Sequence, residues 1–564
     1  MNDPLNDCPL SPPPVRFNIA RYCLAANAAA MPDKTALIVD SGVGEDRRWS
    51  YGEFDRAVRR LAGGLGRLGL APGERLMIRM DNDVPYILTF FAALAAGLVP
   101  LPSAAALTGE EAEFLLTDSA AAAVALSDNL KLGSGTPAHV QIVRTEEIVE
   151  MARSAVPVAY ADTAAEDPGF LIYTSGTTSG TVGRPKGVLH GHRTAWGRRP
   201  MYKGWYGITG NDVILHAGAF NWTYTLGVGM IDPWANGATA VLYNGPPDPA
   251  VWPELIARHG VTIFATVPSL YRRILKYGSL RRERLASLRH GLTAGEPLPP
   301  DVLEAWRAAT ATNLYEALGM SEISTYISTG PDMTIKPGSP GKVQAGRRVV
   351  ILPPQPSTDR ADERGEASLQ AADAPAEATA DPVSVETTGG WLEQLRPLPA
   401  GEIGLLAVHR SDPGLMLGYW RRPEEEAIVY RGEWFCGGDL AHMDADGYVW
   451  FHGRNDDILN PMGYRLSPLE IEGVLERHPM VQEVAVSELA VSPDVTILVA
   501  FVIAQEHGLH EQRDEALILN WAREHLAAYK VPRKIVFVDH LPRTRNGKLL
   551  RRDLPQWIGQ LSGD

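Results

Sequence analysis

One stretch decides how the chain is interpreted, and it reads Phe170-Leu171-Ile172-Tyr173-Thr174-Ser175-Gly176-Thr177-Thr178-Ser179-Gly180-Thr181-Val182-Gly183-Arg184-Pro185-Lys186-Gly187. Its apolar start predicts a buried strand, which runs into a loop of hydroxyl-bearing residues and glycines. Glycines let backbone N–H groups approach an anion closely, the hydroxyls add donors, and Lys186 adds a positive charge. We therefore expect a polyphosphate site, although the loop lacks the Gly-Lys-Ser or Gly-Lys-Thr of the common P-loop. A solvated linker is the alternative, but linkers seldom follow directly on a buried strand.

Length and composition restrict the class of protein. With 564 residues the chain is too long for a single core, so we expect two or more domains. The net charge of -14 argues against nonspecific binding to nucleic acid or to an anionic membrane. Residues 1–16 lack the apolar core of a signal peptide and no apolar run could span a bilayer, so we expect a cytoplasmic protein without a stable membrane anchor. Three scattered cysteines favour neither disulfides nor a zinc site.

Helix and strand patterns alternate along the chain. Ser50 and Glu53 form a candidate capping box. Apolar residues at helical spacing follow it, at Phe54, Val58, Leu61, Leu65 and Leu68. Short apolar strands are expected near 76–80 and 98–101, and a second series runs from Val213 to Pro268, which predicts an α/β fold with mostly parallel sheets. Residues from about 353 to 397 have no periodicity and few apolar residues, and are interpreted as a flexible insertion.

The stretch at 170–187 resembles the phosphate loop of the adenylate-forming superfamily, which holds acyl-CoA synthetases, luciferases and peptide-synthetase adenylation domains. The family signature is Thr-Ser-Gly-Thr-Thr-Gly-x-Pro-Lys-Gly. Here Thr-Ser-Gly-Thr occurs twice, at 174–177 and at 178–181, so that the loop has four extra residues. Either copy aligns with the signature, which leaves the register of the phosphate contacts open, while Lys186 is the same in both alignments.

The resemblance extends over about residues 15–557 and implies an architecture. It implies an α/β protein with a large N-terminal domain, residues 1–455, of layered α/β sheets plus a distorted β-barrel. A small, mobile α+β domain is expected at 456–564, with Asp456 as the hinge.

Further motifs occur in the family's order, and the resemblance assigns roles to their residues. Lys548, Glu322 and Lys186 are implied to be catalytic, with Glu322 as the Mg²⁺ ligand because a hard cation needs oxygen ligands. The implied contacts to ATP or AMP are Thr174, Ser175, Gly176, Thr177, Thr178, Gly295, Glu296, Pro297, Glu316, Ser321, Asp439, Arg454 and Arg465. Among these, the loop at 293–298 is implied to pack against adenine, Asp439 and Arg454 to hold ribose, and Arg465 to reach phosphate. Gly463 and Tyr464 are implied to contact coenzyme A.

Aromatic residues at 220, 222 and 224 allow two interpretations. Such runs are most often core packing. The local sequence around Phe220, Trp222 and Tyr224 resembles that of medium-chain and benzoate-type ligases, in which this region borders the acyl pocket. Acetate-specific relatives carry a Trp at the position that matches Gly319, so glycine there implies an open acyl pocket and poor use of acetate.

These features predict an ATP-dependent acid:CoA ligase that acts through acyl-AMP on an aryl or medium-chain acid. Its cofactors would be ATP, Mg²⁺ and coenzyme A, and its partner a small carboxylic acid rather than a nucleic acid. Two alternatives remain open: an enzyme that passes its acyl group to a carrier protein, and a non-catalytic nucleotide-binding protein with a disrupted phosphate loop. The oligomeric state also stays open, with a homodimer as one candidate.

Overall fold

The architecture is that of a computed structural model. It describes residues 10–174, 185–246, 248–354, 395–455, 459, 466, 468–492, 495–505, 511–526, 528–543 and 549–555. Four sheets occur in these ranges, and one of them has 14 strands. Most of the insertion expected at 353–397 therefore lies outside the described residues.

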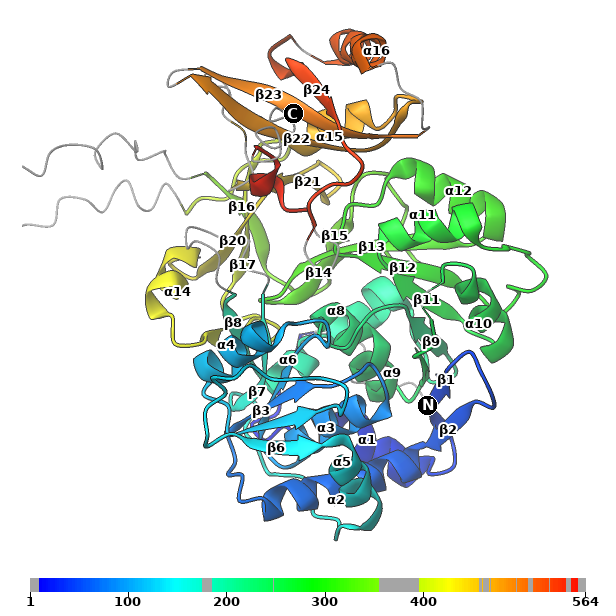
Figure 1. Ribbon diagram of the computed structural model, residues 1–564, viewed down its shortest axis with the longest axis vertical. Helices are drawn as coiled ribbons and strands as arrows, with labels where there is room; N and C mark the ends of the chain where they lie inside the picture. Colours follow the sequence, from blue (N-terminus) through cyan, green and yellow to red (C-terminus); the bar gives the residue numbers. More distant parts are fainter. Residues whose placement is uncertain are drawn as a thin grey trace, which may run out of the picture.

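The 14-stranded sheet forms the centre of the N-terminal part (Figure 1). Its path is β16 (Val349–Leu352), β17 (Gly404–His409), β20 (Trp434–Met443), β21 (Tyr448–Arg454), β15 (Gly341–Val343), β14 (Ser324–Ser328), β13 (Asn313–Met320), β12 (His290–Ala294), β11 (Ile263–Thr266), β9 (Val213–His216), β10 (Thr239–Tyr243), β1 (Thr35–Asp40) and β2 (Arg47–Ser50), and β19 (Tyr430–Arg431) pairs with β20. The six strands from β13 to β1 are parallel to their neighbours. The prediction of mostly parallel α/β layers holds for this half of the sheet.

The other half of the sheet is antiparallel, from β13 through β14 to β16. The family resemblance implied a distorted β-barrel in this region. In the described residues no barrel closes, because β14 pairs with β13 and the following strands continue the main sheet to an open edge at β16. The backbone groups at the edge of β13 are thus satisfied by β14 rather than by a separate barrel.

Two smaller sheets complete the N-terminal part. The parallel sheet contains β4 (Val99–Pro102), β3 (Arg75–Arg79), β5 (Ala123–Leu126) and β6 (Gln141–Arg144), and the antiparallel one contains β18 (Gly418–Tyr419), β8 (Gly187–Gly191) and β7 (Pro168–Tyr173). The expected strands near 76–80 and 98–101 correspond to β3 and β4 and are confirmed.

Helices cover these sheets. They are α1 (Ile19–Ala30), α2 (Tyr51–Arg67), α3 (Val84–Ala95), α4 (Gly109–Ser119), α5 (Thr145–Ser154), α6 (Arg193–Trp196), α7 (Arg199–Met201), α8 (Thr223–Leu226), α9 (Asp232–Ala235), α10 (Val251–His259), α11 (Pro268–Tyr277), α12 (Pro300–Thr310) and α14 (Pro423–Val429). Two π-helical turns lie at Tyr202–Tyr206 and Gly227–Ile231. Helix α2 begins with the predicted capping box, in which the side chains of Ser50 and Glu53 each accept a backbone N–H of the other residue. Its predicted apolar face is buried from Phe54 to Leu65.

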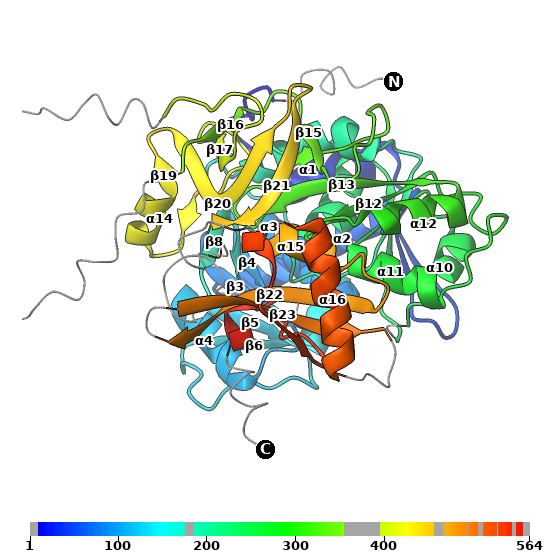
Figure 2. The same ribbon diagram turned by 90° about the horizontal axis from the view of Figure 1, so that it is seen from above.

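The C-terminal part is a separate α+β unit at one end of the molecule (Figures 1 and 2). Its sheet contains β22 (Val481–Ser492), β23 (Val495–Ala504) and β24 (Lys534–Phe537), with helices α15 (Pro468–Leu475) and α16 (Glu511–His525). It has its own apolar core around Ile471, Val486 and Ile518. Among the residues that the structure describes, no helix combines the length and the apolar character needed to cross a membrane.

Candidate active site

The predicted phosphate loop connects two adjacent antiparallel strands, β7 and β8. Phe170, Leu171 and Ile172 are buried, which confirms the predicted buried strand. At the base of the loop, the N–H of Thr174 donates to the carbonyl of Lys186 at 2.9 Å. Thr174 and Lys186 therefore lie side by side in the structure. The predicted phosphate contacts Ser175, Gly176, Thr177 and Thr178 lie outside the described residues.

Lys186 is buried and paired with an acidic residue that the sequence analysis did not identify. Its side chain is only 3% exposed, and its ammonium lies 2.7 Å from a carboxylate oxygen of Glu425 on α14. Arg422 donates to the same carboxylate at 2.9 Å. Burial alone would raise the pKa of Glu425, but the hydrogen bonds from Lys186 and Arg422 outweigh burial and hold this pKa below its usual value. The predicted phosphate-binding lysine is thus an ion-paired group in this structure.

Tyr419 connects Lys186 with the predicted magnesium ligand. The Tyr419 hydroxyl donates to Oε1 of Glu322 at 2.7 Å, and the ammonium of Lys186 lies 5.2 Å from the centre of the Tyr419 ring. Glu322 is buried in the turn between β13 and β14. Mg²⁺ is usually held by one or two carboxylates together with substrate phosphates. One oriented carboxylate beside a lysine fits that requirement.

The predicted ribose contacts face each other across two strands. Asp439 on β20 and Arg454 at the end of β21 are direct neighbours in the strand register. Their side chains form an ion pair of 3.0 Å, and Asp439 is 4% exposed. The structure therefore brings together an acceptor and a donor that could bind ribose hydroxyls and phosphate oxygens.

The predicted adenine loop is shaped by a buried acid. Glu316 on β13 accepts a hydrogen bond from the N–H of Leu298 at 3.0 Å, which fixes the turn after Pro297. Burial raises the pKa of Glu316 to about 8, so that its carboxyl is mainly protonated at neutral pH. Gly295 has a φ of +92°, and a Cβ there would lie 2.9 Å from the Trp222 ring. Glycine at 295 thus allows Trp222 to pack directly on this turn.

The remaining residues of that loop have separate environments. Glu296 accepts weak hydrogen bonds of 3.3 Å from the backbone and the hydroxyl of Ser269, and burial raises its pKa. The carbonyl of Ser321 accepts a hydrogen bond of 2.8 Å from the ring nitrogen Nε2 of His190. Ser321 is therefore positioned through its backbone by a residue on β8.

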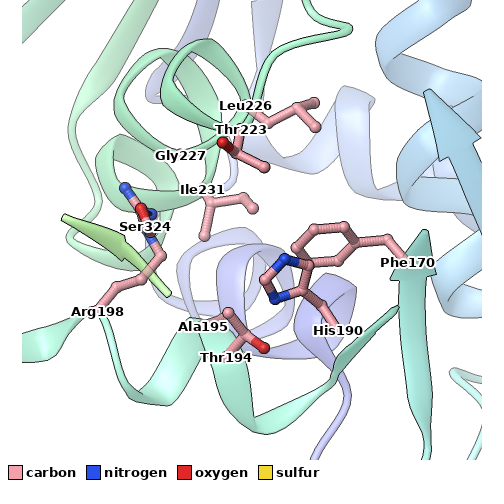
Figure 3. A pocket seen from close by; sticks show the side chains of 10 residues that line it. All are labelled: Phe170, His190, Thr194, Ala195, Arg198, Thr223, Leu226, Gly227, Ile231 and Ser324. Atoms are coloured by element: carbon pink, nitrogen blue, oxygen red, sulfur yellow. Dashed lines mark hydrogen bonds between the residues drawn. The ribbon is translucent and has the colours of Figure 1, made fainter. Parts of the chain in front are cut away.

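A small cavity lies behind the turn that carries Glu322. Its volume is about 20 Å³, and it is lined by Phe170, His190, Thr194, Ala195, Arg198, Thr223, Leu226, Gly227, Ile231 and Ser324 (Figure 3). None of the four predicted acyl-pocket residues belongs to this lining. Thr223, Leu226 and Gly227 do belong to it: Thr223 lies between two members of the predicted aromatic run, and Leu226 and Gly227 follow shortly after the run.

The four predicted acyl-pocket residues have different surroundings. Tyr224 lies in the core, where its hydroxyl donates to two backbone carbonyls at 3.3 Å. Phe220 is buried beside Tyr86, with ring centres 5.7 Å apart, whereas Trp222 is half-buried. A Cβ at Gly319 would lie 2.2 Å from the carbonyl oxygen of Ser324, so that this position has no room for a side chain.

Several predicted residues of the C-terminal part cannot be placed. Asp456, Gly463, Tyr464, Arg465 and Lys548 lie outside the described residues. The described residues that flank 460–465 pair with each other through their backbones, and so do those that flank 544–548. Leu459 and Leu466 exchange backbone hydrogen bonds of 2.9 and 2.8 Å, and Arg543 forms an antiparallel bridge with Leu549.

Comparison with known proteins identifies the family. The family model described as AMP-binding enzyme matches residues 24–367, and the model for the AMP-binding enzyme C-terminal domain matches residues 470–548. The chain belongs to the AMP-binding enzyme family. The predicted membership of the adenylate-forming superfamily is thereby confirmed.

Relatives resemble the chain over nearly its whole length. The benzoate–CoA ligase of Thauera aromatica is 30% identical and covers 95% of each chain. The human mitochondrial acyl-coenzyme A synthetase ACSM5 is 30% identical over 96% of this chain and 90% of its own. The structure of ATP-bound MatB from Rhodopseudomonas palustris superimposes with a TM-score of 0.81 at 26% identity, over 97% of this chain and all of the other. The predicted α/β fold class, apart from its β-barrel, and the predicted class of enzyme, an AMP-forming acid:CoA ligase, are confirmed.

Proposed function

We propose that this protein is an ATP-dependent acid:CoA ligase that acts on an aryl or medium-chain carboxylic acid. The observation that supports this best is the contact of Tyr419 with both Glu322 and Lys186. These two residues are far apart in sequence, and each was expected at the phosphates of ATP. Their convergence on one buried tyrosine supports a single phosphate and metal site. The names of the benzoate–CoA ligase and acyl-coenzyme A synthetase relatives support the range of acids.

The first half-reaction joins the carboxylate to the α-phosphate of ATP and releases pyrophosphate. Charge neutralisation is its main requirement. Glu322 would hold Mg²⁺, which would supply positive charge to neutralise the phosphates, and Asp439 with Arg454 would orient the ribose. Lys186 would bind phosphate oxygens after it leaves Glu425. We propose that Lys548 stabilises the negative charge that develops at the α-phosphate.

In the second half-reaction the CoA thiol attacks the acyl carbon of acyl-AMP and AMP leaves. We propose that the C-terminal unit, from Asp456 onward, rotates about that residue between the two steps. Rotation would remove Lys548 and present Gly463 and Tyr464 to coenzyme A. One site would then serve two reactions in turn.

Separate assays of the two half-reactions test this proposal. We expect Lys548→Ala to abolish pyrophosphate release from ATP and acid, but to retain most thioester formation from supplied acyl-AMP, because only the first step redistributes phosphate charge. Equal loss of both steps would contradict the assignment. Product formation with and without CoA distinguishes a CoA ligase from an enzyme that serves a carrier protein, and absence of pyrophosphate release with every acid would indicate a non-catalytic protein.

A further inference from the structure

The cavity behind Glu322 contains an acceptor that no described residue satisfies. His190 is 1% exposed and lies on β8, and its ring stacks on Phe170 with centres 4.6 Å apart. Its Nε2 lies 2.8 Å from the carbonyl oxygen of Ser321, which can only accept. Nε2 therefore carries the hydrogen. Burial lowers the pKa of His190 to about 4, so that the ring is neutral near pH 7 and Nδ1 has a lone pair.

Nδ1 of His190 is buried and makes no hydrogen bond to the part of the chain that the structure describes. An unsatisfied buried acceptor is unfavourable, because it has lost its hydrogen bonds to water without replacing them. Figure 3 shows the imidazole at the border of the cavity, with Phe170 beside it and with Arg198 and Ser324 on the opposite side. A donor in the cavity would remove this cost.

The charged group of the cavity, Arg198, is already neutralised. Nε and Nη2 of Arg198 donate to the two carboxylate oxygens of Asp232 at 2.7 and 2.6 Å, and Nη1 donates to the hydroxyl of Ser324. Burial would lower the pKa of Arg198, but Asp232 outweighs burial and raises it. Tyr206 donates to the same aspartate. Because Asp232 balances the guanidinium, the cavity has no spare positive charge for a second carboxylate.

The size of the cavity restricts its occupant further. A volume of about 20 Å³ is enough for one water-sized group. The remaining walls are mostly apolar, and they include Leu226 and Ile231. A hydroxyl or an amino group has this size and can donate to a lone pair, whereas a methyl group has the size but leaves the acceptor unsatisfied.

The cavity adjoins the turn that carries Glu322, the predicted Mg²⁺ ligand. Ser324 lines it and lies two residues after Glu322, and His190 contacts the residue before Glu322. From the opposite side, Thr223 lines it and directly follows Trp222, whose ring packs on the adenine loop at Gly295. An acid bound beside Glu322 would therefore have this cavity in its immediate surroundings.

We infer that the acid is an aromatic one whose ring carries a hydroxyl or amino group, and that this group occupies the cavity and donates to Nδ1 of His190. The inference rests on the proposed ligase function and narrows its range of acids. Straight-chain acids and dicarboxylic acids would be poor substrates. A straight-chain acid has no group that can donate to Nδ1 of His190, and a dicarboxylic acid would bring an uncompensated negative charge into the cavity.

A panel of substituted benzoates tests this inference. Pyrophosphate release is measured with benzoate and with each hydroxy-, amino- and methylbenzoate isomer, and methyl isomers serve as size-matched controls. We expect kcat/KM for at least one hydroxy or amino isomer to exceed that of the corresponding methyl isomer by roughly tenfold to a hundredfold. A panel in which methyl isomers equal or exceed both other series would overturn the inference, whatever happens to the variants below.

Two variants connect the preference with His190. His190→Gln keeps a donor for the Ser321 carbonyl but removes the acceptor at Nδ1, so the ratio of kcat/KM between the donor and methyl isomers should fall to within about threefold. Thr194→Val is the matched control, since this hydroxyl lines the cavity but donates to the carbonyl of Gly191 at 2.8 Å. It should retain the ratio. An unchanged ratio in a folded His190→Gln protein would overturn the inference.

Calorimetric binding of the same acids without ATP separates this inference from the proposed function. Tighter binding of the hydroxy or amino isomer without any pyrophosphate release would refute the ligase function and leave the ligand class standing. Release of pyrophosphate with benzoate or with straight-chain acids, without preference for a donor in either assay, would support the ligase and refute the ligand class.

Discussion

Replacing Glu316 by Gln should stabilise the protein at neutral pH. Glu316 is 8% exposed, and burial raises its pKa to about 8 from an ordinary value of 4.5. At pH 7 its carboxyl is therefore mainly protonated in the folded chain and ionised in the unfolded chain. A glutamine keeps the oxygen that accepts the N–H of Leu298 and has no charge to lose.

The magnitude follows from the two pKa values. Because the folded pKa is raised, the contribution of Glu316 to stability is fully present below pH 4.5 and is lost as pH rises toward 8. At pH 7 the unfolded carboxyl is 2.5 pH units above its pKa, at about 1.4 kcal/mol per unit, while the folded carboxyl has barely ionised. Glu316→Gln should therefore raise the free energy of unfolding by roughly 3 kcal/mol at pH 7, and by only about 1 kcal/mol at pH 5.

Urea unfolding at pH 5, 6, 7 and 7.5 measures this difference directly. Glu304→Gln on α12 is the matched control, because it removes an exposed carboxylate by the same chemical change. The stability gain from Glu316→Gln should increase as pH rises across this range. A gain that stays constant or falls would refute the conclusion that the Glu316 carboxyl is protonated in the folded protein.

Two further substitutions test the residues that hold the phosphate site. Glu425→Gln should lower KM for ATP several-fold, because Glu425 competes with phosphate for Lys186. Glu424→Gln, at the exposed neighbouring residue, serves as the control. A higher KM in Glu425→Gln would show that Glu425 positions the lysine instead. Tyr419→Phe should destabilise the protein by about 1–3 kcal/mol and raise the Mg²⁺ concentration for half-maximal activity, since Glu322 loses the donor that orients it. Unfolding and Mg²⁺ titrations measure both effects, and an unchanged Mg²⁺ requirement would contradict the second one.

Local patterns predicted those parts of the fold that depend on neighbouring residues. Ser50 and Glu53 are three positions apart and mark the beginning of α2, because a capping box requires only one helical turn. The apolar run at 170–172 is buried in β7 for a similar reason: its composition alone indicates a strand. The barrel was not predictable in this way, since its closure depends on which strand pairs with the edge of β13.

The partners of the predicted site residues could not be found from the sequence. Tyr419 contacts Glu322 across 97 positions, and Glu425 pairs with Lys186 across an even longer separation. Neither residue belongs to a motif whose composition indicates phosphate or metal. His190 was missed because the role proposed for it depends on which ring nitrogen is engaged, and that depends on the carbonyl of Ser321.

Gly319 shows how a pattern can be informative while its simplest test is unsuitable. Glycine at 319 was interpreted as leaving the acyl pocket open, because acetate-specific relatives carry Trp at this position. Gly319→Trp would therefore be the obvious variant with which to test the size of the pocket. A Cβ at this position would lie 2.2 Å from the carbonyl oxygen of Ser324, and the backbone of the turn would have to move. Glu322 lies in that turn. A loss of activity in Gly319→Trp would therefore report on the displaced carboxylate as well as on pocket size.

The pairing of Lys186 with Glu425 also explains how a buried lysine could be released to a substrate. Removing one partner from a buried ion pair normally leaves an unpaired charge, at a cost of about 3–5 kcal/mol. Glu425 has a second cation, Arg422, at 2.9 Å, so its carboxylate stays paired when Lys186 turns to phosphate. In this structure the lysine also lies over the face of Tyr419, while the hydroxyl of the same tyrosine donates to Glu322. Transfer of Lys186 from Glu425 to a polyphosphate would thus exchange one anion for another without leaving either partner uncompensated.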